Sequence, residues 1–353
     1  MRGSIRLFKV AGISINIHIT FFLLLFLFLS MGLKWLLLLV AIFFFVTLHE
    51  LSHSLVAKRF GVEVKEITLL PIGGVASMAK IPDKPYQEFL IALAGPMLNI
   101  AVVVIFFIPL YYILGPEVLF SPLSMKTMPH VVAYIYRINL ILAGFNLIPA
   151  FPMDGGRILR AVLAQKMGYK KATRIAVNCG HIFALIFGYI GLTNGYIMLI
   201  LIAVFIFMAA SSEEQQVDIR ETLKKFKIKD IVPSEFTTLK TDATLSKVLE
   251  LIFHSHQEDF PVTEASGGRM IGFITRKDIT GGIHQYGTSA HVKEIMRKSF
   301  PALKETDSLD DAQTLMQESD MRALPVVKNH SIIGVVTIED ISRVYTVMSD
   351  KRQ

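Results

Sequence analysis

Apolar residues are distributed very unevenly along this chain. Residues 13–211 consist of runs rich in Leu, Ile, Phe and Val, whereas residues 212–353 mix apolar and polar positions as a water-exposed domain does. A helix needs about 20 consecutive apolar residues to cross a bilayer. We therefore predict an α-helical membrane part followed by a polar part. Six runs are predicted as membrane-spanning helices: 15–32, 35–57, 88–114, 129–149, 176–193 and 195–211.

A different pattern separates the second run from the third. Short strands are predicted here by Val62, Val64, Ile67 and Leu69, with Gly73–Gly74 as their turn. Non-helical backbone at membrane depth must be buried in protein or line a cavity. We therefore expect a small β element after the second helix, beside a functional site. An ordinary loop in the cytoplasm is the alternative.

The polar part contains an internal repeat. Its copies, about 228–284 and 293–347, share a Pro-Val dipeptide and a later G-x-x-T-x-x-D-I segment. Each copy also has an amphipathic helix before these segments, at 244–256 and 308–319. Alternation of short strands and helices at a fixed period predicts a small α/β unit in two copies. The domains are then a membrane domain 1–211, a polar helix or linker 212–227 and the repeated unit 228–353.

Charge supports a membrane location and argues against a nucleic-acid partner. Only 18% of residues are charged, against about 25% in ordinary soluble domains, and the net charge is +7. Basic residues lie mostly beside the apolar runs, in the N-terminus and in the loops after the second and fourth runs. Such loops face the cytoplasm. Six spans then place both termini on the cytoplasmic side of the cell membrane, and the single cysteine allows no intramolecular disulfide.

Metal-binding chemistry is suggested near the end of the second run by the segment His49-Glu50-Leu51-Ser52-His53. Residues i and i+4 share one helix face, so both imidazoles can bind one zinc ion. Glu50 can then act as the general base that takes a proton from water. Ionisable residues inside a membrane are functional candidates by default. The alternative is a polar face that lines a pore or contacts another helix.

A catalytic zinc needs a third protein ligand, and Asp154 is the candidate. It is the acid nearest the end of the fourth run, which topology places at the same membrane depth as the two histidines. Pro149 and Pro152 end the helix, and Gly155–Gly156 permit a sharp turn there. The alternative role for Asp154 is to cap a helix over 156–166.

The two motifs together resemble the site-2 protease family of intramembrane zinc metalloproteases. The segment 146–157, N-L-I-P-A-F-P-M-D-G-G-R, fits that family's N-x-x-P-x-x-P-x-D-G pattern, and 94–99 fits its G-P-x-x-N element. The resemblance implies one zinc ion per chain with Asp154 as third ligand. It also implies that Asn99 and Asn146 orient the scissile backbone or assist the oxyanion, although buried asparagines can instead join helices. The implied substrate is a membrane-anchored protein.

The repeat resembles a tandem pair of CBS domains, which implies binding of an adenine nucleotide such as ATP, ADP or AMP, and a homodimer. By this resemblance, Asp278 and Asp340 hold ribose hydroxyls, and Thr275 and Thr337 contact phosphate. A carboxylate can accept hydrogen bonds from two hydroxyls. The alternative is that both aspartates cap the helices that follow them.

The leading hypothesis is an intramembrane zinc metalloendopeptidase that cleaves membrane-anchored proteins within or near their transmembrane segment, under nucleotide control. A CBS-regulated transporter or channel is the main alternative. The absence of a visible repeat between the two membrane halves argues weakly against a transporter. A noncatalytic scaffold is a third possibility, and the presence of Glu50 argues against it.

Overall fold

The computed structural model describes residues 3–71, 73–78, 84–122, 124–233, 235–255, 257–264, 269–329 and 331–350. The chain divides into two compact units, Met1–Val217 and Asp218–Gln353. The first unit contains the membrane helices and a small sheet, and the second contains the repeated α/β elements. The expected fold class is confirmed.

The first apolar run forms a strand and a short helix instead of a spanning helix. Its beginning, I-S-I-N-I-H, alternates strictly and becomes strand β2 (Ile13–His18), because a period of two favours a strand over a helix. Helix α1 (Thr20–Ser30) has 11 residues and is about 16 Å long, too short to cross a bilayer alone. The prediction of a helix over 15–32 is therefore wrong.

Four strands form one sheet in the order β1-β2-β3-β4. Strand β1 (Ser4–Val10) is antiparallel to β2, β2 is parallel to β3 (Val64–Leu70), and β3 is antiparallel to β4 (Gly73–Met78). Strands β3 and β4 confirm the predicted β element after the second helix. The predicted turn at Gly73–Gly74 is wrong, because these glycines are the first two residues of β4.

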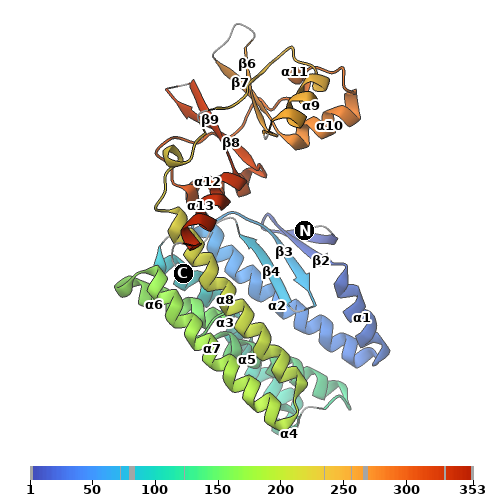
Figure 1. The fold of residues 1–353 in the computed structure, drawn as a ribbon. Coiled ribbons are helices and arrows are strands. Elements are labelled where there is room, and N and C mark those ends of the chain that lie inside the picture. Colours follow the sequence, from blue (N-terminus) through green and yellow to red (C-terminus); the bar gives the residue numbers. More distant parts are fainter. Residues whose placement is uncertain are drawn as a thin grey trace. The chain divides into compact units, whose positions relative to one another are not determined.

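Five helices in the described part of the chain are long and apolar enough to cross a membrane. Helix α3 packs against α2, α5 and α6, and the sheet lies along α2 through β3 and β4 (Figure 1). The long helices are α2 (Leu33–Arg59), α3 (Pro85–Leu114), α5 (Met128–Asn146), α7 (Tyr169–Asn194) and α8 (Ile197–Leu223), and the shorter ones are α4 (Pro116–Leu119) and α6 (Asp154–Met167).

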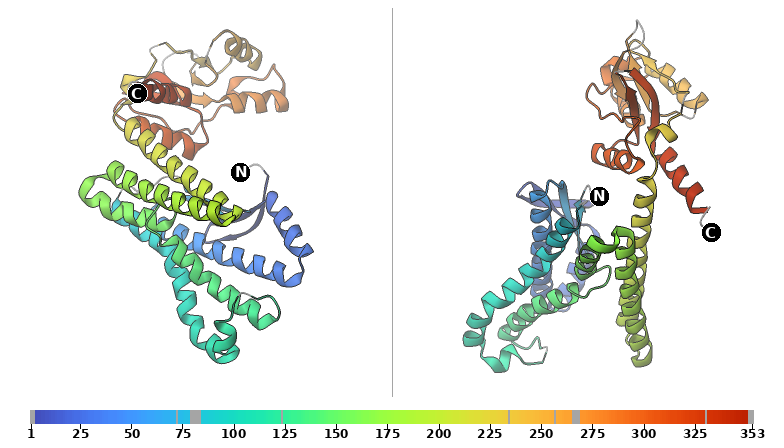
Figure 2. Two further views of the ribbon diagram at one scale, coloured as in Figure 1. Left: turned by 60° about the horizontal axis from the view of Figure 1, so that its bottom comes forward. Right: turned by 90° about the vertical axis from the view of Figure 1, so that its left-hand side faces the viewer.

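Helices α7 and α8 lie side by side (Figure 2) because small residues on α7 allow close approach. A Cβ atom at Gly191 would lie 3.0 Å from the backbone nitrogen of Ile200, and one at Gly188 would lie 3.7 Å from the Cβ of Ala203. Interfaces between membrane helices are rich in such residues, since little drives association except close packing.

The second unit repeats one arrangement twice, as predicted. In the first copy β5 is parallel to β6 and β6 is antiparallel to β7. In the second, β8 is antiparallel to β9, and a parallel bridge between Leu303 and Val326 takes the place of β5. The elements are η1 (Ile228–Asp230), β5 (Leu239–Lys240), α9 (Leu245–His254), β6 (Phe260–Thr263), β7 (Met270–Ile274), α10 (Arg276–Tyr286), α11 (Val292–Ile295), α12 (Leu309–Ser319), β8 (Ala323–Lys328), β9 (Ser331–Thr337) and α13 (Ile338–Asp350).

Candidate metal centre and nucleotide-binding residues

Two histidines of α2 point at the same place between α2 and α3. His49 and His53 are only 6% and 5% exposed, and their Nε2 atoms lie 3.1 Å apart. The Nδ1 atom of His53 lies 2.6 Å from the carbonyl oxygen of Ile91 on α3. Since a carbonyl only accepts, Nδ1 must carry the proton, which leaves Nε2 with a free lone pair for a metal ion.

Asp154 completes this cluster from a distant part of the chain. Its Oδ2 atom lies 3.0 Å from Nε2 of His49 and 3.1 Å from Nε2 of His53. Asp154 is the first residue of α6, and Met153 occupies the N-cap position. Helix α6 therefore begins two residues earlier than predicted, and the side chain of Asp154 faces the histidines instead of serving as the N-cap.

The glycines after Asp154 have a different use from the predicted one. Gly155 and Gly156 lie inside α6 and have no positive φ, so they do not form a sharp turn. A Cβ atom at Gly155 would lie 2.5 Å from the carbonyl oxygen of Leu147, and one at Gly156 would lie 2.5 Å from the carbonyl carbon of Ala150. The glycines thus allow the segment that follows α5 to fold back closely on the start of α6.

The donor set fits a zinc ion. The three donor atoms lie 3.0–3.1 Å from one another, close to the separation of about 3.3 Å that tetrahedral zinc with bonds of 2.0–2.1 Å requires. Two imidazoles and one carboxylate are a usual three-ligand set for catalytic zinc, which keeps its fourth position open. Among the described residues this is the cluster of His, Cys, Asp and Glu side chains able to hold a metal.

Helix α3 approaches the donors through a residue without a side chain. A Cβ atom at Gly95 would lie 2.6 Å from Nε2 of His49 and would also clash with His53. Ile91, Gly95 and Asn99 are spaced by four residues and share one face of α3. Gly95 belongs to the sequence motif at 94–99, and the close packing of α2 against α3 explains why this position is glycine.

Asn99 lies one turn beyond Gly95 and is fully buried. Neither its Nδ2 nor its Oδ1 atom has a hydrogen-bond partner among the described residues, although buried polar groups nearly always have one. Such a side chain suits contact with a bound molecule. Asn146 is half-buried at the last position of α5. The roles of both asparagines stay predictions.

Glu50, the predicted general base, is half-buried beside β4. A Cβ atom at Gly74 would lie 2.7 Å from Cγ of Glu50, so the backbone of β4 packs directly on this side chain. Strand β4 is at one edge of the sheet. The sequence interpretation missed this role of Gly74, although glycine within a strand often marks close approach of another group.

The remaining membrane histidines lie outside the cluster. Nδ1 of His18 lies 2.8 Å from Oγ1 of Thr20. His130 lies 2.6 Å from Thr127 at the start of α5. His181 contacts Ser211 at 3.0 Å and stacks on Phe207, joining α7 to α8.

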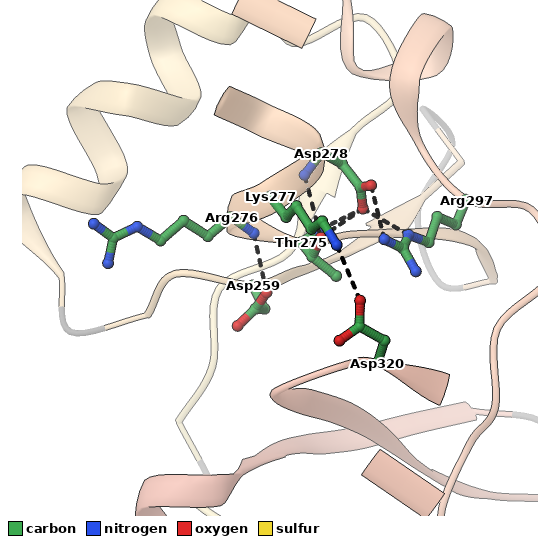
Figure 3. A network of polar contacts seen from close by, with 7 residues as sticks. All are labelled: Asp259, Thr275, Arg276, Lys277, Asp278, Arg297 and Asp320. Carbon is green, nitrogen blue, oxygen red and sulfur yellow. Dashed lines mark hydrogen bonds and ion pairs between the residues drawn. The ribbon is translucent and has the colours of Figure 1, made fainter. Parts of the chain in front are cut away.

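In the first CBS-like copy, the carboxylate of Asp278 is fully engaged within the protein (Figure 3). Its Oδ2 atom accepts hydrogen bonds from the backbone nitrogen of Thr275 at 3.0 Å and from its hydroxyl at 2.6 Å. Arg297 donates to both carboxylate oxygens, at 2.8 and 2.9 Å. Partial burial opposes ionisation, but the hydrogen bonds from Arg297 and Thr275 outweigh it and hold the pKa of Asp278 below its usual range.

The second copy lacks this arginine contact. Oδ2 of Asp340 accepts from the backbone nitrogen of Thr337 at 3.0 Å and from its hydroxyl at 2.7 Å; the described residues provide no further contact to this carboxylate. The repeat explains the difference. A Cβ atom at Gly272 would meet the carbonyl oxygen of Arg297, and one at Gly334 would meet that of Pro233, so proline occupies the position that arginine has in the first copy.

Both aspartates therefore take part in helix capping. Thr275 is the N-cap of α10 and forms a reciprocal capping box with Asp278. Thr337 and Asp340 show the same hydrogen bonds at the start of α13. The capping alternative is thus observed in both copies, and a further role in nucleotide binding stays a prediction for all four residues.

Comparison with known proteins shows the class to which this chain belongs. The sequence model described as Peptidase family M50 matches residues 37–187, and the CBS domain model matches residues 228–284 and 292–346. The zinc metalloprotease MJ0392 of Methanocaldococcus jannaschii is 35% identical over 358 residues, covering 100% of this chain and 99% of its own. The protein is therefore a zinc metalloprotease, a hydrolase embedded in the membrane.

More precisely, the chain belongs to peptidase family M50, as a site-2 protease with a tandem CBS pair. The stage IV sporulation protein FB of Bacillus subtilis is 26% identical over 175 residues, covering 49% of this chain and 57% of its own. A solved structure of the site-2 protease from M. jannaschii is 43% identical, covering 60% of this chain and 95% of its own with a TM-score of 0.46. The family is one of proteases, not of transporters or channels.

Proposed function

We propose that this protein cleaves membrane-anchored proteins within or near their transmembrane segments, with His49, His53 and Asp154 as zinc ligands. The observation that carries this proposal is the convergence of three donor atoms, from α2 and from α6, to within 3.1 Å of one another. The chain spans the membrane through several apolar helices, so these donors act on protein substrates that share the bilayer.

The chain's own residues have distinct parts in peptide hydrolysis. Zinc, when bound, lowers the pKa of a water molecule in its open position and polarises the scissile carbonyl. The Glu50 carboxylate takes the proton from the attacking water and delivers it to the leaving amide nitrogen. The hydrogen bond from His53 to the carbonyl oxygen of Ile91 keeps the imidazole in one orientation. The free amide of Asn99 and that of Asn146 hold the substrate backbone.

The substrate pairs with the edge strand β4. A transmembrane helix hides its carbonyl groups in internal hydrogen bonds, so cleavage requires an extended segment. An exposed strand edge offers hydrogen bonds to such a segment. Because Gly74 packs on Glu50, a substrate strand added to β4 lies beside the general base.

Two substitutions test the proposed peptidase site. Glu50→Gln is expected to abolish cleavage of a membrane-anchored substrate while zinc stays bound, because the glutamine cannot take a proton. His49→Ala is expected to lose both zinc and cleavage. The readouts are zinc per chain in the purified protein and cleavage in proteoliposomes. Zinc retained by His49→Ala, or full cleavage by Glu50→Gln, would contradict the assignment.

The CBS pair binds an adenine nucleotide, and its two copies are unequal in this respect. Ribose hydroxyls need a carboxylate oxygen that is free to accept. Both oxygens of Asp278 already accept from Arg297, whereas the described contacts of Asp340 involve only Thr337 and one oxygen. The nucleotide therefore binds at Thr337 and Asp340 in preference to Thr275 and Asp278. Association of two CBS pairs makes the protein a homodimer.

Both termini lie in the cytoplasm, as the positively charged loops indicate. The described part of the chain has five long helices, an odd number, so this topology requires one further crossing. Strand β2 and helix α1 together supply about 36 Å of chain, enough for a hydrocarbon core of about 30 Å. Labelling of single cysteines at Ser4 and Ser342, in a Cys179→Ser background, by an impermeant reagent tests the topology: labelling of intact cells at either position would contradict it.

A further inference from the structure

Among the described residues, Arg160 of α6 is the largest fully buried side chain, with 1% of its surface exposed. Its Nε and Nη2 atoms both donate to Oε1 of Glu88 on α3, the former at 2.8 Å. Its Nη1 atom donates to Oε1 of Glu213 on α8 at 2.7 Å. The guanidinium also lies 4.7 Å from the ring centres of Phe151 and Tyr169. One side chain thus joins three helices and two aromatic rings.

This cluster encloses the segment that carries Asp154. Arg160 follows Asp154 by six residues on the same helix, a rise of about 9 Å. Phe151, whose ring contacts the guanidinium, precedes Asp154 by three residues, and its backbone nitrogen donates to the carbonyl oxygen of Ala176 on α7 at 3.2 Å. Arg160 and Phe151, which contact each other, therefore flank the third metal donor on its two sides along the chain.

Stability alone does not explain such a cluster. Removing charges from water is costly, and a buried ion pair is often no more stable than apolar side chains of the same volume. A planar guanidinium, however, fixes direction through several hydrogen bonds at once. This property matters where one carboxylate must meet two imidazoles at a set distance.

We propose that Arg160 is a positioning residue, which holds Asp154 against His49 and His53 through its contacts with Glu88 and Phe151. Glu213 is the member of this cluster that lies on α8. Helix α8 continues without a break from Ile197 to Leu223, past the end of the first unit at Val217, so one helix carries both Glu213 and the first residues of the second unit. The inference rests on the proposed zinc site.

The test measures zinc affinity, by competition with a chromophoric chelator, and the visible spectrum of the Co²⁺-substituted full chain. Arg160→Lys keeps the charge but loses the planar contacts, and we expect zinc affinity to fall about tenfold or more with an altered cobalt spectrum. Glu213→Gln leaves the Arg160–Glu88 pair intact, and we expect zinc affinity to fall less than in Arg160→Lys.

Glu214→Gln is the matched control. Glu214 is the next residue on α8 and pairs at 3.0 Å with Arg174, at a surface where the two side chains are 31% and 59% exposed. Its substitution is expected to change neither readout. A purely structural role of the cluster would lower thermal stability and leave the zinc affinity and cobalt spectrum of the folded protein as in the wild type, which would overturn the inference.

Two outcomes separate this inference from the proposed function. In the first outcome, the wild type binds zinc and His49→Ala loses it, but Arg160→Lys and Glu213→Gln keep the zinc affinity and cobalt spectrum of the wild type. This outcome overturns the inference alone. A wild type that binds no zinc, or zinc unaffected by His49→Ala, overturns the proposed site and the inference together. If Arg160→Lys does not fold, Glu213→Gln decides by the same readouts.

Discussion

At the scale of single residues, the absence of a side chain at Gly95 is as important as the donors themselves. Its missing Cβ leaves the space in which the Nε2 atoms of His49 and His53 lie. Alanine forms helices more readily than glycine, so a methyl group at this position should leave α3 folded and act on the metal donors alone.

Gly95→Ala is therefore expected to lower the zinc content at least about tenfold, with helix content unchanged by circular dichroism. Gly144→Ala on α5 is the control, because nothing lies within 4 Å of the Cβ position there. Elemental analysis of both purified variants provides the measurement. Zinc binding by Gly95→Ala equal to that of the control would show that the helices can separate without loss of the site.

The ion pair between Asp278 and Arg297 should make the first CBS copy sensitive to acid. The pKa of the folded Asp278 carboxyl is lowered, against an ordinary value of about 3.9 in the unfolded chain. The stabilisation is therefore complete above about pH 4 and is lost as the pH falls through the lower, folded value.

Arg297→Met should accordingly weaken protection of the α10 backbone amides at neutral pH, by about 1 kcal/mol for a partly exposed pair. The difference from the wild type should shrink at pH 3. Hydrogen exchange of α10 peptides, corrected for intrinsic rates, measures it. A difference that is constant between pH 7 and pH 3 would exclude ionisation of Asp278 as its origin.

At this scale, the sequence alone predicted the three residues whose donor atoms converge in the structure. His49 and His53 share a helix face because they are four residues apart, and Asp154 followed from the need for a third ligand. Gly74 and Arg160 could not be predicted in this way. Their partners lie 24 and 72 residues away, at Glu50 and Glu88, and only tertiary packing brings them together.

At the scale of elements, hydrophobic periodicity predicted the long helices. It failed at the first apolar run, which begins with the two-residue period of a strand and continues as a helix. Residues 13–18 alternate strictly, while 21–29 are continuously apolar. Counted together they have the length of one membrane helix. The strands β1 and β2 were missed for this reason, and the sheet they build with β3 and β4 could not be predicted.

The proposed pairing of the substrate with strand β4 can be tested at the scale of elements. Successive residues of an antiparallel strand direct their N–H groups to alternate sides, so one of Val75 and Ala76 donates to β3 and the other to the open edge. Proline removes that donor. Val75→Pro and Ala76→Pro should both reduce cleavage of a transmembrane substrate several-fold with zinc binding retained, measured in proteoliposomes. Unchanged cleavage by both variants would exclude pairing of substrate with β4.

At the scale of the whole molecule, the repeat in the second unit was predictable because both copies share one sequence pattern. The difference between the two copies in the partners of their aspartates was not predictable. It depends on which residue packs against the glycine of β7 and of β9. Arg297 and Pro233 occupy matching positions, and this difference leaves the two aspartates with different partners.

The full chain in detergent should consequently bind one AMP per chain. Asp340→Asn is expected to lower AMP affinity about tenfold to a hundredfold, through loss of charge-assisted hydrogen bonds, while Asp278→Asn should leave it nearly unchanged. Isothermal titration measures both stoichiometry and affinity. Two equal sites, or a greater loss in Asp278→Asn, would contradict the proposed preference, and no binding at all would contradict a nucleotide function.

The unbroken course of α8 also bears on how zinc binding could affect nucleotide binding. Thermodynamic linkage is reciprocal: a ligand that alters the affinity of a second site is itself bound more or less tightly, by the same factor, when that second site is filled. If nucleotide binding changes the zinc affinity through Glu213, removal of the metal with a chelator must change the nucleotide dissociation constant by the same factor. In such a protein, the occupancy of the catalytic centre would alter nucleotide binding by the CBS pair.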